Sequence, residues 1–127
     1  MPALNFRSEF ADSVEYGIKR QTVRALRKHP FRQGDTLYLY TNQRTKYCRR
    51  LAVVQCTRVD PVYMDNERLV VDGICLSAGV RDEFARADGF FNWMNMLDWF
   101  ENVHGLPFEG QVIYWDDPIE FHFRGCK

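Results

Sequence analysis

The 127-residue sequence lacks any apolar run approaching the roughly 20 residues that a membrane-spanning helix requires. Residues 1–7 also lack the basic stretch followed by an apolar stretch that marks a signal peptide. Neither membrane insertion nor secretion is therefore expected, and the sequence predicts a cytoplasmic protein.

Metal-ligand patterns are missing as well. The sequence holds 4 cysteines and 3 histidines, but it contains no C-x-x-C pair, and the histidines share no ligand spacing with one another or with the cysteines. This argues against a zinc site, and we expect neither a metal nor another cofactor. The cysteines are predicted to be reduced thiols, with Cys56 and Cys75 buried as small hydrophobic residues.

The chain shows no internal repeat, no low-complexity tract and no linker. Hydrophobic residues make up 46% of it, which excludes a largely disordered protein. Residues 1–127 are therefore predicted to form one domain around a single core.

The net charge is zero, but the charges are unevenly distributed along the chain. Residues 1–58 carry 12 Lys/Arg against 4 Asp/Glu, whereas residues 59–127 carry 5 against 13. A basic half can bind phosphates, and the asymmetry can also favour a protein partner or a homodimer. Equally, the two halves can simply pair with each other in the fold.

Periodicity and turn residues predict an α+β fold with about five to seven strands and two or three helices. Helices are expected at residues 8–16, 79–87 and 92–103, the last capped by Asn92. Eight runs are candidates for these strands: residues 21–25, 36–40, 46–59, 62–64, 69–71, 74–76, 111–115 and 119–123. Short strand-rich runs are typical of a small curved sheet or barrel with helices packed at its ends.

The most informative segment is residues 17–24, which read Gly-Ile-Lys-Arg-Gln-Thr-Val-Arg. It places a base, a hydroxyl and an anion-binding group close together, as Lys19, Thr22 and Arg24. In a strand, Thr22 and Arg24 share one face. Amide hydrolysis requires a nucleophile and a base, and burial can lower the pKa of a lysine enough for it to act as that base.

This segment and several later motifs resemble the ASCH domain family, a PUA-like fold linked to RNA and modified nucleosides. The resemblance covers about residues 3–115 and leaves residues 116–127 as a C-terminal extension. It rests on the order of its motifs, which are the G-x-K-x-x-T pattern at 17–22 and residues 34–37, 44–46, 84–90 and 105–110. It implies a PUA-like β-barrel whose cleft is lined by residues 17–24 and by the helical segment near Asp88.

Some members of this family are amidohydrolases that remove the acetyl group from N4-acetylcytidine with a lysine, a threonine and a glutamate. By position, Lys19 and Thr22 match the first two. The glutamate position falls on Asp88, which keeps the carboxylate on a side chain one methylene shorter. The resemblance thus suggests Thr22 as the nucleophile and Lys19 as the base. Asp88 would orient the lysine or protonate the leaving amine.

A second set of residues suggests nucleic-acid or nucleoside binding, because basic residues contact phosphates and interleaved aromatic rings stack on bases. This set is Arg24, Arg27, Lys28, Arg32, Tyr38, Tyr40, Arg44 and Lys46. Alternation along a strand places Tyr38 and Tyr40 on one face. There they can also cover the core and keep their hydroxyls in water.

Four functions therefore stay open: hydrolysis of N4-acetylcytidine, binding of a nucleoside or single-stranded RNA without turnover, RNA cleavage, and protein interaction. RNA cleavage is reported for other family members, but the sequence offers no acidic cluster suited to a divalent ion. Thr22, Lys19 and Asp88 also fit a strand residue, a solvated lysine and a turn residue. The aromatic stripe at residues 93–100 is predicted to be core.

Overall fold

The computed structural model describes residues 3–116. Over this part of the chain it contains seven strands and three helices. In chain order they are β1 (Ala3–Phe6), α1 (Ser8–Glu15), β2 (Gln21–Ala25), β3 (Thr36–Thr41), β4 (Arg49–Met64), β5 (Leu69–Val71), β6 (Ile74–Cys75), α2 (Ala78–Ala87), α3 (Trp93–Val103) and β7 (Phe108–Trp115). The predicted α+β class is confirmed.

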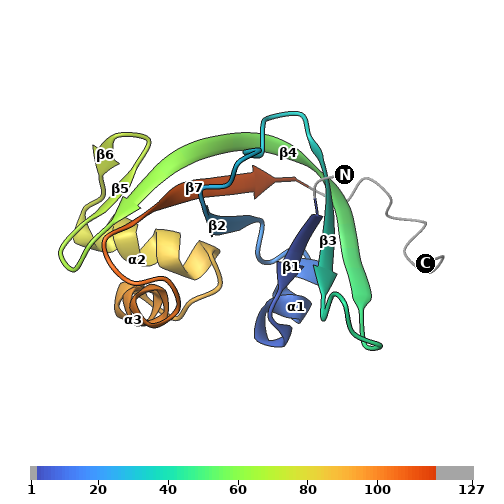
Figure 1. The fold of residues 1–127 in the computed structure, drawn as a ribbon. Helices are drawn as coiled ribbons and strands as arrows, with labels where there is room; N and C mark the ends of the chain where they lie inside the picture. The colour runs from blue at the N-terminus through green and yellow to red at the C-terminus, as the bar shows by residue number, and fades with distance from the viewer. Residues whose placement is uncertain (1–2, 117–127) are drawn as a thin grey trace.

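The sheet is organised around β4, a 16-residue strand that arches across the molecule (Figure 1). At one end of the arch, β4 pairs with β3, which pairs in parallel with β1. At the other end, β4 pairs with β5 and β7, and β7 pairs with β2. The β4–β7 register shifts between Cys56 and Arg58, and irregularities of this kind bend and twist a strand.

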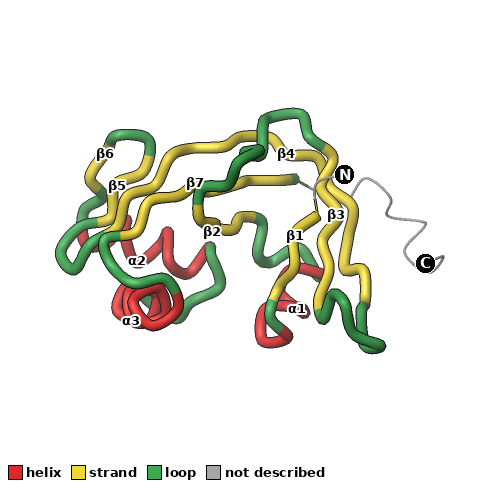
Figure 2. The backbone as a smooth tube through the Cα atoms, viewed as in Figure 1, coloured by secondary structure: helices red, strands yellow, loops and turns green. Residues whose placement is uncertain are grey.

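Two hydrophobic clusters fill the concave side of the arch, and Figure 2 shows a helical layer beneath each. The first packs Ala11 and Val14 of α1 against Leu37 and Leu39 of β3. The second packs α2 and α3 against β5 and the end of β4 and contains Phe100, which is 1% exposed. The core is therefore divided, and a polar site can lie where the two parts meet.

The junction between the two clusters is made by Phe10 of α1 and Phe90 of the α2–α3 connection. Their rings meet edge to face at 5.5 Å between centroids. Gly89 has a φ of +101°, and a Cβ at this position would lie 2.8 Å from Cδ1 of Phe10. Glycine is therefore required both by the backbone conformation and by the close approach of the ring.

The three predicted helices are confirmed, with small shifts of their ends. Asn92 caps α3 as predicted, since its side-chain oxygen accepts a hydrogen bond of 2.9 Å from the backbone N–H of Asn95. The adjacent N–H of Trp93 donates to Asp82 of α2 at 2.9 Å, which ties the two helices together.

The predicted closure into a barrel is wrong, because the sheet stays open. In the described part of the chain, β1 pairs only with β3, and β2 pairs only with β7. A side chain spans the gap in place of a backbone ladder: Arg24 of β2 donates from a terminal guanidinium nitrogen to the carbonyl of Asn5 in β1 at 2.8 Å. A cavity lies at the opening between these two strands.

Some predictions about cysteines and strands are confirmed and others are wrong or untested. Cys56 is buried as expected, but Cys75 is exposed because it lies on the two-residue edge strand β6. β1 was not predicted as a strand, and the strand expected at residues 119–123 lies outside the described residues. Within residues 3–116, no helix is both long enough and apolar enough to cross a membrane.

Candidate functional site

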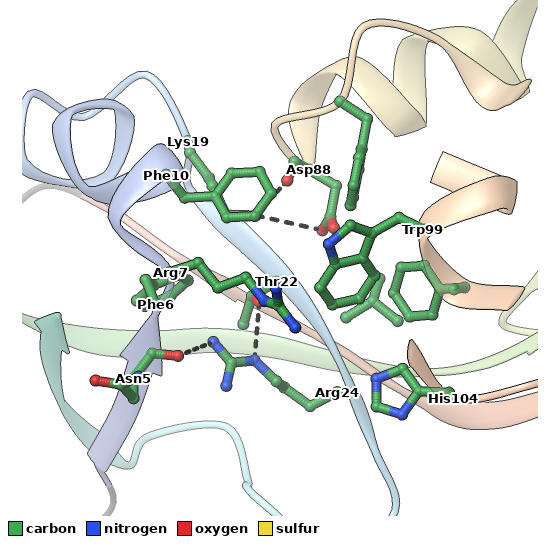
Figure 3. Close-up of a pocket in the computed structure, with 13 residues that line it drawn as sticks. Asn5, Phe6, Arg7, Phe10, Lys19, Thr22, Arg24, Asp88, Trp99 and His104 are labelled. Carbon is green, nitrogen blue, oxygen red and sulfur yellow. Dashed lines mark hydrogen bonds and ion pairs between the residues drawn. The ribbon is translucent and has the colours of Figure 1, made fainter. Parts of the chain in front are cut away.

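The cavity has a volume of about 250 Å³ and lies between the two hydrophobic clusters, at the gap between β1 and β2 (Figure 3). Its deepest polar side chains are Lys19, Thr22 and Asp88, which are 3%, 4% and 3% exposed. Aromatic rings make up much of its wall: Phe6, Phe10, Phe90, Trp99 and Phe100. An apolar wall with a few convergent polar groups is the usual character of a small-molecule site.

Lys19 enters the cavity because the chain turns sharply after α1. Gly17 adopts a φ of +77°, and the backbone N–H of Lys19 donates to the carbonyl of Ser13 at 2.9 Å. Asp88 comes from the opposite side, where it forms the C-cap of α2. The two residues are distant in sequence and meet only through the packing of α1 against the α2–α3 connection.

The Lys19 ammonium forms a buried ion pair with Asp88. Nζ lies 3.7 Å from Oδ1 and also donates to the backbone carbonyl of the same residue. The rings of Phe10 and Phe6 lie 5.2 and 5.8 Å from the ammonium, so the cation has aromatic faces nearby. Gln21, which is also buried, donates from its side-chain amide to Asp88 Oδ1 at 3.3 Å.

Burial moves the pKa values of this pair in opposite directions. It lowers the pKa of Lys19 below the ordinary value of 10.5, against the opposing effect of the Asp88 charge. It raises the pKa of Asp88 above 3.8, against the opposing effect of the Lys19 charge. Desolvation penalises both charged forms, so a proton passes from the lysine to the carboxylate at a lower cost than it would in water.

Thr22 and Arg24 lie on one face of β2, as alternation predicted. Nε of Arg24 donates to the Thr22 hydroxyl oxygen at 3.0 Å. Because that oxygen accepts from a cation, the hydroxyl proton of Thr22 remains available to another acceptor. Burial lowers the pKa of Arg24 to about 10, which still leaves the guanidinium charged at neutral pH.

The rim of the cavity carries two further polar residues, Arg7 and His104, both exposed. The Arg7 guanidinium carbon lies 5.2 Å from the centroid of the Trp99 ring, so the side chain reaches from the start of α1 to α3. Burial lowers the pKa of His104 below 6.5, and the nearby charges of Arg24 and Arg7 lower it further.

The other residues predicted to bind nucleic acid lie elsewhere. Of the eight, Arg24 lines the cavity and the remaining seven do not. Arg27, Lys28 and Arg32 line a separate surface hollow of about 420 Å³. Tyr38 and Tyr40 are half-buried on β3, on the face opposite the buried Leu37 and Leu39. The last two, Arg44 and Lys46, are exposed in the loop between β3 and β4.

Sequence reasoning missed several residues of the cavity. Trp99 was assigned to the core, but it is only partly buried and forms part of the cavity wall. Gln21 does not line the cavity, but it holds Asp88 through its hydrogen bond, and it was missed because a glutamine in a strand gives no signal of its own. Only the structure shows that Gln21 and Thr22, on opposite faces of β2, are both buried.

Comparisons with known proteins identify the fold as ASCH-like. No protein-family model matches the sequence, and no curated protein matches it. Among solved structures, the chain is similar to the crystal structure of a mutant of ZmASCH from Zymomonas mobilis, with a TM-score of 0.57. The similarity covers 91% of this chain and 67% of that chain at 12% sequence identity. At this identity the similarity shows the fold alone, and the role of each residue must be argued from the cavity itself.

Proposed function

We propose that the cavity is the active site of an amidohydrolase that removes the acetyl group from N4-acetylcytidine or a closely related N-acylated pyrimidine. The observation that carries the proposal is the buried Lys19–Asp88 pair, which lines the same cavity as Thr22. A lysine of lowered pKa that shares a cavity with a hydroxyl can supply the base that activates this weak nucleophile.

The reaction begins with proton transfer from the Lys19 ammonium to the Asp88 carboxylate. This step leaves a neutral amine as base and a carboxylic acid as proton donor, the two groups that amide hydrolysis requires. The opposite pKa shifts of the pair lower the cost of the transfer. Two titratable groups whose environments suit them to acid and base roles are the usual signature of such a site.

Thr22 then attacks the acetyl carbonyl carbon as Lys19 takes the hydroxyl proton. The C–N bond breaks, the leaving amine of cytidine takes a proton from Asp88, and the acetyl group stays on Thr22 as an ester. The Lys19 ammonium then passes its proton to Asp88 again, and neutral Lys19 deprotonates a water molecule that attacks the ester. Asp88 returns a proton to the Thr22 oxygen as the ester C–O bond breaks. The sum is N4-acetylcytidine plus water giving cytidine plus acetic acid, which releases a proton to solvent and becomes acetate. The Arg24 guanidinium, 3.0 Å from the Thr22 oxygen, stabilises the negative charge that develops there.

The size and wall of the cavity favour a single base over a longer ligand. Its volume of about 250 Å³ lies just below the usual range of roughly 300 to 1,000 Å³ for small-molecule pockets. Phe10, Phe90 and Trp99 supply ring faces and edges against which a pyrimidine can pack.

The experiment is to incubate the purified protein with N4-acetylcytidine and to follow cytidine release by liquid chromatography. Thr22→Ala removes the nucleophile, and Thr22→Ser restores a hydroxyl at the same position. We expect release by the wild type, none by the alanine variant and partial release by the serine variant. Equal release by the wild type and the alanine variant would refute the proposed chemistry.

The second candidate is recognition of the same ligand, or of single-stranded RNA, without turnover. The aromatic wall and the arginines at the cavity favour binding whether or not chemistry follows. Under this alternative, the wild type and Thr22→Ala bind N4-acetylcytidine with similar affinity and neither releases cytidine. Calorimetry on both proteins, run beside the release assay, separates the two functions.

A further inference from the structure

We infer that Arg7 forms an anion subsite at the mouth of the cavity, with Arg24 adding positive charge deeper in, and that the ligand carries a phosphate at Arg7. The inference rests on the proposed function for the identity of the base, a cytosine. It deepens that function by making the ligand a nucleotide, either as a free 5′-monophosphate or as part of an RNA strand.

The first observation is the charge around the cavity. Arg7, Lys19 and Arg24 all line it, and Asp88 supplies one carboxylate against these three cations. Lys19 is paired with that carboxylate at 3.7 Å. Within residues 3–116, no carboxylate forms a salt bridge with Arg7 or Arg24, although the Asp88 charge also acts on Arg24. Of the cavity cations in this part of the chain, Arg7 therefore has the least compensated charge.

The second observation is what these two arginines do contact. Arg24 uses two of its nitrogens, one toward Thr22 and one toward the Asn5 carbonyl, and both acceptors are uncharged. Arg7 contacts the ring of Trp99 and makes no hydrogen bond to another described residue through its guanidinium. Planar guanidinium groups recognise phosphate through paired N–H donors, and those of Arg7 remain available.

The third observation is position. The acetyl chemistry requires the base to reach Lys19, Thr22 and Asp88, which are almost fully buried. Arg7 is exposed at the rim, where Figure 3 shows it reaching over the cavity between Thr22 and Trp99. A base inserted toward the buried pair therefore leaves its sugar and 5′-phosphate at the rim, within the field of Arg7.

The test uses ligands that cannot react, so that it does not depend on turnover. Cytidine, cytidine 5′-monophosphate and the RNA trinucleotide UCU are titrated by calorimetry into the wild-type protein. We expect at least one phosphorylated ligand to bind about tenfold more tightly than cytidine, a typical gain for charged hydrogen bonds. The tighter of the two phosphorylated ligands identifies the source of the phosphate, a monoester or a phosphodiester.

The control is a matched pair of substitutions. Arg7→Gln and Arg86→Gln each remove one positive charge from an exposed arginine, but Arg86 lies on α2 outside this cavity. Arg7→Gln is expected to abolish most of the preference for phosphate, and Arg86→Gln is expected to keep it. If both variants lose the phosphate preference equally, the preference comes from the overall charge of the protein, and the subsite is overturned.

The outcomes also separate this inference from the proposed function. Phosphate preference contradicts the hydrolase and leaves the subsite in place if N4-acetylcytidine releases no cytidine and its 5′-monophosphate releases no cytidine 5′-monophosphate. Cytidine release with equal affinities for cytidine and both phosphorylated ligands overturns the subsite and leaves the hydrolase in place. Failure of all three ligands to bind at millimolar concentration also overturns the subsite.

Discussion

Two basic regions of this protein look alike in sequence and differ in structure. One is the cavity, with Lys19 and Arg24, and the other is the surface hollow of the loop after β2, with Arg27, Lys28 and Arg32. The cavity cations are largely removed from water and contact named partners, whereas all three loop residues are exposed. This difference matters for chemistry, because burial shifts the pKa of a charged group far more than an exposed position does, and acid–base catalysis depends on such shifts.

The largest effect that separates these regions is expected from Lys19→Met, which keeps the length of the side chain and removes the base. We expect kcat for acetyl hydrolysis to fall on the order of a thousandfold, as for loss of a residue in a catalytic unit. The reactive form of the Lys19–Asp88 pair holds one proton. In the wild type, kcat/KM should therefore fall at high pH through an apparent pKa below 10.5, as the pair loses the proton that Asp88 donates. A Lys19→Met variant that keeps the wild-type kcat would show that another group is the base.

The next effect concerns stability. Asp88→Asn leaves the buried Lys19 cation without its counter-charge, and we expect the free energy of unfolding to fall by about 3 kcal/mol at neutral pH. Urea denaturation measures the change. The double variant Lys19→Met/Asp88→Asn should lose less than the sum of the two single variants, because the two groups are coupled. Strict additivity would contradict the pairing.

A smaller effect tests the contact that joins the two halves of the core. Gly89→Ala places a Cβ against Phe10 at a φ of +101°, and we expect a loss of about 1 to 3 kcal/mol. Gly79→Ala in α2 is the matched control. It meets nothing within 4 Å and should raise stability by about 0.5 kcal/mol. Thermal unfolding of the two variants checks the difference in sign.

The smallest effect is expected at the loop after β2. Replacing Arg27, Lys28 and Arg32 together by glutamine should change kcat/KM for N4-acetylcytidine by less than about twofold, because exposed charges are screened by solvent and salt. If the loop binds RNA, the same variant should flatten the salt dependence of RNA affinity by about 0.7 for each phosphate that the loop no longer neutralises. A large loss of nucleoside turnover would place the loop in the active site after all.

Local signals in the sequence identified much of this fold. Asn92 caps α3 and Gly17 follows the end of α1, and both could be predicted because each depends on the residue type at one position. The sequence predicted two strands at residues 46–59 and 62–64, but β4 continues through Pro61 as one strand from Arg49 to Met64. The Pro61 carbonyl accepts from the N–H of Asp72, and the nitrogen and the carbonyl of one strand residue face the same side. The Pro61 nitrogen therefore faces away from β7, and no hydrogen bond to β7 is lost.

The site was only partly readable for a different reason. Lys19, Thr22 and Arg24 lie on one short segment, so their proximity follows from the chain itself. Asp88 was located by the resemblance, and its burial against Lys19 follows from packing that no local pattern encodes. The bridge from Arg24 to Asn5 exists because the sheet stays open, and the prediction of a closed barrel concealed it.

The central claim is that the cavity, and not the basic surface, receives the nucleoside. The most direct measurement is an NMR titration of the ¹⁵N-labelled Thr22→Ala variant with N4-acetylcytidine. We predict amide shifts concentrated on residues that line the cavity, including Lys19, Arg24, Phe90 and Trp99. Shifts confined to residues 26–35 and 42–48, or no shifts at millimolar ligand, would contradict the claim.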